Sequence, residues 1–255
     1  MPARSLTLTA LAGLPLIKPG DDLAALLIAA LKRTQFVPQS KDIIIVAQKV
    51  VSKAEGRFVD LKNVVPSSRA VALGEEVNKD ARLVEVILSE SEEIIRKQRD
   101  VLIVAHRRGF IMANAGVDQS NVADENEELV LLLPRDPDGS AAALKARLDR
   151  EFGVDLAIVI NDSFGRPWRR GVVGVALGVA GLPVLRNMIE VPDLFGRKMR
   201  VTEIAVADEI AAAGSLLMGQ GAEGQPAVHL RGLDWNEQAQ PASAALRPKH
   251  TDLFR

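Results

Sequence analysis

Cysteine is absent from this chain of 255 residues, and aromatic residues make up only 4% of it. Without a thiol the protein can form no disulfide, no thiolate metal site and no cysteine nucleophile. The formal net charge of -1 leaves no strongly basic surface to hold a nucleic-acid backbone. The few aromatic side chains also argue against a base-stacking platform. We therefore expect no nucleic-acid partner.

A cleavable leader and a membrane span are also missing from the sequence. The first 17 residues carry one arginine and are followed by Lys18, Asp21 and Asp22, without a signal-peptide cleavage site. The longest weakly polar run, residues 171–185, is shorter than the ~20 residues that cross a bilayer. Hydrophobic residues (47%) and charged residues (25%) are in the usual globular balance. We expect a soluble cytoplasmic protein that does not bind membranes.

Helical and strand patterns mix along the chain without regular alternation. Apolar spacing predicts helices over residues 23–31, 69–77, 81–95, 140–153 and 203–218. Buried-strand runs lie at residues 43–47, 101–105, 154–160 and 227–230, and residues 109–113 are the expected hairpin partner of the second run. This mixture favours an α+β fold over a doubly wound sheet. After Trp235 the composition becomes polar and proline-rich, so residues 236–255 are predicted to form a loose tail.

The glycine-rich run GQGAEG at residues 219–224 matches the dinucleotide-binding fingerprint by letter only. That fingerprint requires a strand before it and a helix after it, whereas here the predicted order is the reverse. A glycine loop can still bring backbone N–H groups close to a phosphate, although a flexible connection is the simpler interpretation. Since the chain also contains no Walker loop, any nucleotide must be bound by other means.

Two aspartates, Asp118 and Asp162, are predicted to lie in loops beside apolar runs. Carboxylates in such places suit hard divalent cations, which take oxygen ligands, and Ser163 offers a further oxygen. A single loop aspartate more often stabilises a turn. The presence of two such loops, with arginines beside the second, favours a metal and phosphate site only modestly.

Other polar residues carry weaker signals. Basic side chains that could offset phosphate charge are Lys49, Lys53, Arg166, Arg169 and Arg170. A solvated surface is the alternative for each of them. The three histidines, at positions 106, 229 and 250, show no metal-ligand spacing, so we expect structural or surface roles. Close backbone packing explains the glycines at 171, 174, 178 and 181 without any ligand.

Eight sequence blocks, in the same order and from about residue 11 to 235, resemble one known family. The blocks are GLPLIKPGDDLA, VVSKAEGR, NAGVDQSNV, LPRDPDGSA, DSFGRPWRRG, DLFGRKMRVT, VADEIAAA and LLMGQGAEGQPAV. They resemble the coenzyme F420-0:L-glutamate ligases, also called gamma-glutamyl ligases, in their stand-alone form. Several ordered blocks are far more specific than any single motif.

The resemblance implies a GTP-dependent ligase that joins L-glutamate to the lactyl carboxylate of F420-0 through an acyl phosphate, and then adds further gamma-linked glutamates. It implies two divalent sites for Mg²⁺ or Mn²⁺, and a monovalent cation such as K⁺. Residues 1–235 would form the ligase domain, a two-lobed α+β fold that assembles as an intertwined homodimer. Residues 236–255 would follow as the tail.

Site residues carried over from the resemblance fall into two sets. The implied metal ligands are Asp118, Asp162, Ser163 and Gln220. The implied nucleotide contacts are Leu14, Pro15, Leu16, Ile17, Gln48, Lys49, Lys53, Asn121, Met218, Gly219, Gln220, Gly221, Ala222, Glu223, Gly224 and Gln225. Ser163 stands where many relatives have threonine, and Gln220 stands where relatives have glutamate or glutamine. Gln48 and Lys49 replace the Ser-Thr pair of some archaeal relatives.

Two other functions stay open at this point. One is the same chemistry on a different carboxylate acceptor, because the motifs indicate nucleotide and metal rather than acceptor. The other is a non-catalytic nucleotide- or deazaflavin-binding protein, which loss of the metal carboxylates would favour. Both Asp118 and Asp162 are present.

Overall fold

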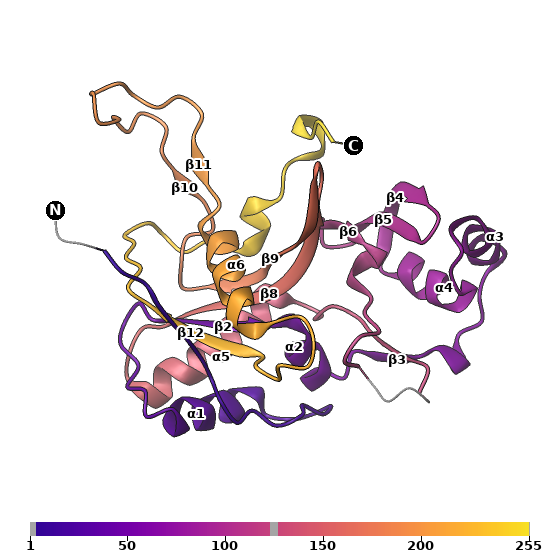
Figure 1. The fold of residues 1–255 in the computed structure, drawn as a ribbon, viewed down its shortest axis with the longest axis horizontal. Helices are drawn as coiled ribbons and strands as arrows, with labels where there is room; N and C mark the ends of the chain where they lie inside the picture. Colours follow the sequence, from indigo (N-terminus) through magenta and orange to yellow (C-terminus); the bar gives the residue numbers. More distant parts are fainter. Residues whose placement is uncertain (1–3, 123–126, 255) are drawn as a thin grey trace.

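A five-stranded sheet, the central sheet, lies at the core of the protein. The structure is a computed structural model that describes residues 4–122 and 127–254. The strand order of the central sheet is β1 (Thr7–Ala10), β12 (Ala227–Arg231), β2 (Ile43–Ala47), β8 (Ala157–Arg166) and β9 (Arg169–Ala180). Only β2 and β8 run parallel; the other neighbours are antiparallel (Figure 1). The predicted α+β class is confirmed.

Helices cover both faces of this sheet, and the sequence of β2 shows why. Alternate residues of a strand point to opposite faces. Ile44 and Val46 pack on one side against α1 (Leu23–Arg33), α2 (Gln48–Ala54) and α5 (Pro137–Phe152). Ile43 and Ile45 pack on the other side against α6 (Val206–Met218). A continuous aliphatic strand is therefore buried on both faces.

The close backbone packing predicted for four glycines is confirmed at Gly174, Gly178 and Gly181, and it is wrong at Gly171, where an added Cβ would meet no atom within 4 Å. A Cβ at Gly174 would collide with the carbonyl group of Ala211 in α6, and one at Gly178 would collide with the carbonyl group of Pro137 in α5. The two helices therefore approach β9 more closely than any larger residue would permit.

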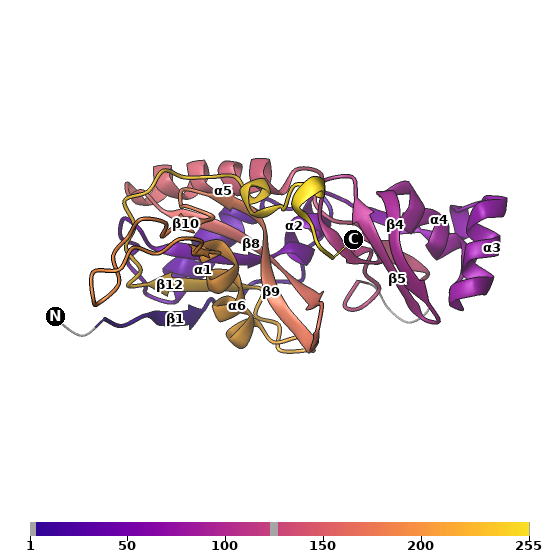
Figure 2. The same cartoon turned by 90° about the horizontal axis from the view of Figure 1, so that it is seen from above.

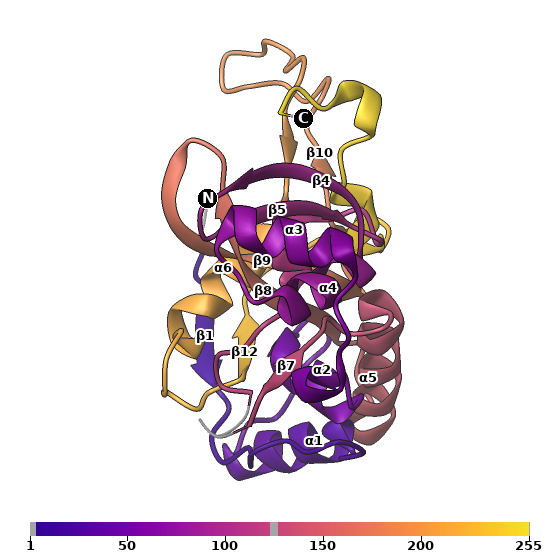
Figure 3. The same cartoon turned by 90° about the vertical axis from the view of Figure 1, so that its right-hand side faces the viewer.

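A second sheet of β4 (Ser91–Gln98), β5 (Val101–His106) and β6 (Ile111–Ala113) lies at one end of the molecule (Figures 2 and 3). Helices α3 (Ser68–Val77) and α4 (Ala81–Ser89) pack on it around a separate apolar cluster. We call these five elements the second-sheet unit. A small cluster in which Phe110 and Met112 meet Leu133 and Leu177 connects it to the central sheet.

Shorter elements complete the fold. Strand β3 (Phe58–Asp60) pairs with β7 (Leu129–Leu131), and β10 (Arg186–Asn187) pairs with β11 (Glu203–Ile204) at the base of a hairpin that projects from the body in Figure 1. Among the described residues, 3₁₀ turns cover Leu61–Asn63, Asn114–Gly116, Ala242–Ala245 and Lys249–Thr251. No helix of the described residues is both long and apolar enough to cross a bilayer.

Three predicted boundaries are wrong. The helix expected over residues 81–95 ends at Ser89, and the next eight-residue segment is β4, because Ile94 pairs with Val104 of β5. Helix α5 begins at Pro137 rather than after Ser140, with proline in the first turn, where its missing N–H costs nothing. The last predicted helix starts at Val206, three residues later than expected.

Strand β8 also differs from its prediction in a way that concerns the site. It was expected to end at Ile160, with the run Asn161, Asp162 and Ser163 in the loop beyond it. The strand continues to Arg166, because these polar residues pair with Ala176, Val175 and Gly174 of β9. The run therefore has a fixed strand geometry.

The segment after Trp235, expected to be loose, is attached to the body. The side-chain oxygen of Gln240 accepts hydrogen bonds from the backbone N–H groups of Val184 (3.0 Å) and Leu185 (2.9 Å). Ala242 is buried, and its N–H donates to Asp138 at 2.9 Å. Three side-chain hydrogen bonds thus hold this part of the tail in place.

Candidate functional site

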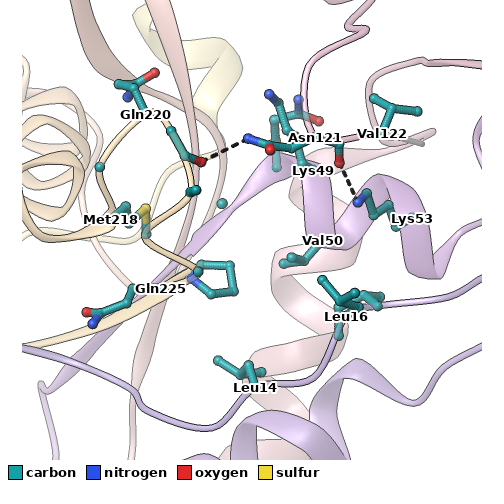
Figure 4. Close-up of a pocket in the computed structure, with 18 of the residues that line it drawn as sticks. Leu14, Leu16, Lys49, Val50, Lys53, Asn121, Val122, Met218, Gln220 and Gln225 are labelled. Atoms are coloured by element: carbon teal, nitrogen blue, oxygen red, sulfur yellow. Dashed lines mark hydrogen bonds between the residues drawn. The ribbon is translucent and has the colours of Figure 1, made fainter. Parts of the chain in front are cut away.

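A cavity of about 680 Å³, the main cavity, lies at the edge of the sheet where β2 ends and its parallel pairing with β8 stops. Ala47 and Asn161 are paired at that edge of the sheet, so both strands present their following residues on the same side. Ligands commonly bind outside the carboxyl ends of parallel strands. The remaining walls come from residues 14–17, α2, residues 121–122 and the loop after α6 (Figure 4).

The main cavity brings together nearly all of the predicted site residues. All of the implied nucleotide contacts line it except Glu223. Three of the four implied metal ligands also line it, namely Asp162, Ser163 and Gln220. The fourth, Asp118, is held beside the wall by an ion pair with Lys49 at 2.8 Å. Segments more than 200 residues apart in sequence, at Leu14 and Gln225, thus form one concave surface.

The two aspartates interact electrostatically. Burial, together with the nearby Asp118 carboxylate, raises the pKa of Asp162 to about 7, although the Ser163 N–H, Lys49 and Gln48 act in the opposite direction. A negative charge nearby makes ionisation of a buried carboxyl group more costly. A divalent cation near them would stabilise the charged forms. The pair therefore has the electrostatics of a cation site.

Neutral oxygens complete the possible donor set. The Ser163 hydroxyl donates to Oε1 of Gln220 at 3.0 Å, so two of the implied ligands are already in contact. The described residues contain no cluster of three or more acidic, histidine or cysteine side chains that could hold a metal ion. Mg²⁺ is commonly bound by one or two carboxylates together with substrate phosphates. Asp118, Asp162, Ser163 and Gln220 fit that pattern.

Two lysines of α2 hold the segment that follows Asp118. Lys49 donates to the Ser120 hydroxyl at 2.8 Å, and Lys53 donates to the Asn121 carbonyl at 2.6 Å. The Asn121 amide in turn donates to the Gly221 carbonyl at 3.0 Å, as the dashed lines in Figure 4 show. Burial and the charge of Lys49 lower the pKa of Lys53. The segment therefore connects α2 with the glycine loop.

The glycine loop turns sharply after α6. Gly219 ends the helix with a positive φ of 71°, and a Cβ there would collide with the Glu223 carboxylate. That carboxylate folds back and accepts the Gly221 N–H at 2.8 Å. Backbone N–H groups of Glu223, Gly221 and Gln220 lower its pKa. The N–H groups of the loop can therefore hold an anion. In this structure they hold the Glu223 carboxylate, which does not line the main cavity.

Some lining residues were not predicted. They are Ala47, Val50, Val122, Glu127, Asn161 and Pro226. Asn161 is buried; its amide donates to the Ser215 hydroxyl at 3.0 Å, while its Oδ1 accepts no hydrogen bond from the described residues. Its position next to Asp162 in the sequence could have identified Asn161 as a lining residue. The apolar lining residues carry no such signal, because any buried aliphatic residue looks the same in sequence.

Other candidates lie elsewhere. Arg166, Arg169 and Arg170 are exposed near the β8–β9 turn and do not line the main cavity. His106 and His229 are buried outside it, and His250 is exposed. Neither group is therefore part of the site.

The sequence of this chain is similar to that of known proteins along nearly all of its length. Residues 13–232 match the family model described as F420-0:Gamma-glutamyl ligase. The chain is 46% identical to the coenzyme F420:L-glutamate ligase of Methanothermobacter thermautotrophicus, over 98% of this chain and 99% of that one. The protein of the same name from Methanopyrus kandleri is 43% identical over 94% and 93%, and that from Archaeoglobus fulgidus is 44% identical over 87% and 86%. The similarity therefore includes the central sheet, the second-sheet unit and every wall of the main cavity.

Proposed function

Because the chain belongs to the F420-0:gamma-glutamyl ligase family, we propose that it joins L-glutamate to the carboxylate of F420-0 with GTP as the phosphoryl donor. The observation that carries this proposal is the main cavity. One edge of the sheet there combines the interacting carboxylates of Asp118 and Asp162 with Lys49 and with a glycine loop.

The main cavity is suited to a nucleotide in size and in lining. Its volume of about 680 Å³ lies within the roughly 300–1,000 Å³ typical of small-molecule sites. The glycine loop supplies backbone N–H groups, and Lys49 and Lys53 supply positive charge toward phosphates. The apolar side chains of Leu14 and Leu16 provide a surface for the base (Figure 4).

Asp118, Asp162, Ser163 and Gln220 are the proposed ligands of Mg²⁺ or Mn²⁺. When bound, the metal would neutralise charge on the transferring phosphoryl group. The chain's own residues position its ligands: Lys49 orients Asp118, and the Ser163 hydroxyl is fixed against Gln220. A K⁺ ion is a further expectation from the resemblance.

The proposed reaction proceeds in two displacements. An acceptor carboxylate oxygen attacks the γ-phosphorus of GTP, the bond to the β-phosphate oxygen breaks, and GDP leaves. The glutamate amine then attacks the acyl phosphate, the acyl–oxygen bond breaks, and phosphate leaves with the amine proton released to solvent. Such a mechanism needs an anionic carboxylate held near a triphosphate. Lys49 and Lys53 would offset part of this negative charge, and a divalent cation held by Asp118 and Asp162 would offset more of it.

Mass spectrometry of the products tests the proposal directly. Purified protein is incubated with GTP, Mg²⁺ or Mn²⁺, L-glutamate and F420-0, and each component is omitted in turn. The expected product is F420-0 extended by glutamate, formed only in the complete mixture. Extension of a different carboxylate acceptor alone, or GTP binding without turnover, would overturn the proposal in favour of the two alternatives. Replacing GTP by ATP tests the choice of nucleotide.

We also propose that two copies of the chain associate. Five large apolar side chains are exposed on the hairpin that β10 and β11 support, namely Ile189, Val191, Leu194, Phe195 and Val201. Leu194 and Phe195 are 99% and 95% exposed, and an apolar group of this kind commonly marks an interface. The separate apolar cluster of the second-sheet unit supports the expected two-lobed organisation. Light scattering that gives a monomer mass at micromolar concentration would contradict association.

A further inference from the structure

A second cavity, of about 470 Å³, lies between the second-sheet unit and the body of the protein. It is lined by Arg57, Glu90, His106, Arg107, Arg108, Pro134 and Arg135, and we call it the arginine cavity. Of the described residues, none lines both this cavity and the main one. The arginine cavity is therefore a separate place on the molecule.

Positive charge is in excess in the arginine cavity. Four arginines face a single carboxylate, Glu90, among its lining residues. Arg57 satisfies that carboxylate, donating to Glu90 at 3.0 Å and to the Leu133 carbonyl at 2.9 Å. The side chains of Arg107 and Arg135 are exposed and donate no side-chain hydrogen bond within the described part of the chain, although the charge of Arg107 helps to lower the pKa of Glu90. Their guanidinium groups therefore retain the capacity to bind an anion.

His106 provides an independent sign of a missing acceptor. Its Nδ1 accepts the backbone N–H of Arg108 at 3.0 Å, so in the neutral ring the proton resides on Nε2. The residue is only 3% exposed, and within the described residues Nε2 has no hydrogen-bond partner. The closest carboxylate oxygen, of Glu90, is 3.7 Å away, which is beyond hydrogen-bond distance, although the imidazole is close enough to lower the pKa of Glu90. A buried donor without an acceptor is costly and calls for an explanation.

We propose that the arginine cavity is an oxyanion site that binds a carboxylate or phosphate group of a small molecule. Guanidinium groups bind both kinds of oxyanion through paired N–H donors, and the His106 Nε2–H supplies a donor from the buried side. A cation would be repelled by the excess of arginine. The site does not depend on the proposed ligase function.

Its location brings it within reach of the main cavity. Asp118 is paired with Leu131, which donates to its carbonyl at 2.8 Å. Arg135 follows Leu131 by four residues, a path of at most ~14 Å along an extended backbone. A small molecule of moderate length can therefore place one anionic group in the arginine cavity while another part lies near Asp118.

The test follows the imidazole signals of His106 by NMR while the protein is titrated with inorganic phosphate or, separately, with glutarate. Both anions are small, and the readout reports binding beside His106 rather than in the main cavity. We expect a saturable shift with at least one anion. Phosphate alone would assign the site to phosphate groups, glutarate alone to carboxylates, and both to their shared chemistry.

The double variant combines Arg107→Gln with Arg135→Gln. The control is Arg150→Gln, because Arg150 is an exposed arginine of α5 outside the arginine cavity. The double variant is expected to weaken anion binding by at least about tenfold, because charge-assisted hydrogen bonds are lost. The control should bind like the original protein. Arg135→Gln alone serves if the double variant does not fold. Absence of a saturable shift with both anions, or equal affinity in the cavity variants, would overturn the proposal. A failed ligase assay would leave these titrations unaffected.

Discussion

The two cavities differ in how their charges are arranged. In the main cavity, positive and negative groups are already in contact: Lys49 pairs with Asp118, and Lys53 is bonded to a carbonyl oxygen. In the arginine cavity, Arg135 makes no ion pair within the described residues, and Arg107 shares the single lining carboxylate, Glu90, with Arg57. The first arrangement suits a ligand that brings both anions and a cation, such as a metal-bound triphosphate. The second suits a bare anion.

The largest expected effect comes from removing a carboxylate of the main cavity. Asp162→Asn keeps the shape of the side chain and removes its charge, and we expect kcat/KM for ligation to fall by roughly a thousandfold, since several kcal/mol of metal-borne charge stabilisation is lost. Asp118→Ala should behave similarly. Glu92→Gln, an exposed change in the second-sheet unit, serves as the control. Near-normal turnover of Asp162→Asn at limiting metal would remove the carboxylates from the metal site.

A smaller effect is expected from Lys53→Met, which keeps the length of the side chain but removes the ammonium group. The loss of one charge-assisted contact should weaken GTP binding by about ten- to a hundredfold. It also breaks the link to the Asn121 carbonyl. Isothermal titration with GTP measures the change, and Lys62→Met, at an exposed position, is the control. If both variants bind GTP equally, Lys53 has only a structural role.

The packing of the central sheet can be tested apart from its chemistry. Gly174→Ala should destabilise the protein by ~1–3 kcal/mol, because the added Cβ would collide with α6. Gly165→Ala lies on the same hairpin, where a Cβ meets no atom within 4 Å. Urea unfolding of the two variants gives the difference. Equal stability would show that α6 can move away from β9 at little cost.

The smallest expected effect is a pH dependence centred on His229. The centroid of this buried ring lies 3.8 Å from the centroid of the Phe36 ring, and its Nε2 lies 3.0 Å from Oδ2 of Asp42. Burial lowers the pKa of His229 from 6.5, despite Asp42, and Arg231 acts in the same direction as burial. The unfolded chain therefore takes up a proton at a higher pH than the folded one. The stability that the neutral, buried His229 contributes is present above pH 6.5, and it is lost as the pH falls from 6.5 towards the lower pKa of His229 in the folded protein.

Urea midpoints at several pH values between 7.5 and 5 measure this dependence. His229→Gln should flatten the curve in that window, whereas His250→Gln, at an exposed position, should leave it unchanged. A curve that is equally steep in His229→Gln and the original protein would assign the pH dependence to other groups.

Much of the fold could be predicted from local patterns. The all-aliphatic β2 and the helix Leu23–Arg33 lie where their apolar spacing indicates. Residues 91–95 were assigned to a helix because Ile94 and Ile95 continue a helical spacing, but pairing with β5 prevails. The polar run from Asn161 to Ser163 looks like a loop in sequence, and only its distant partner β9 makes it a strand. Long-range pairing leaves no local signal.

The candidate site was predicted less from physics than from its resemblance to a family. Charge and spacing alone suggested Asp118 and Asp162, and the glycine run at 219–224 was only a weak match. The predicted strand at residues 43–47 places Gln48 and Lys49 directly after it, but nothing local shows that Lys49 faces both aspartates or that Gln48 reaches Asp162. Nor does the sequence show that Glu223 would bind its own loop, or that arginines from three separate segments would line one cavity.

The pairing of β1 with β12, which matches Thr7 with Arg231 and Ala10 with Val228, has a consequence for biosynthesis. Residues near the start of the chain form one wall of the main cavity, and Gln225 and Pro226 form another. A nascent chain on the ribosome can therefore assemble the second-sheet unit early, since its residues are local in sequence. It cannot complete the main cavity until the last strand has left the exit tunnel. Affinity for a nucleotide should accordingly arise in a single late step of translation.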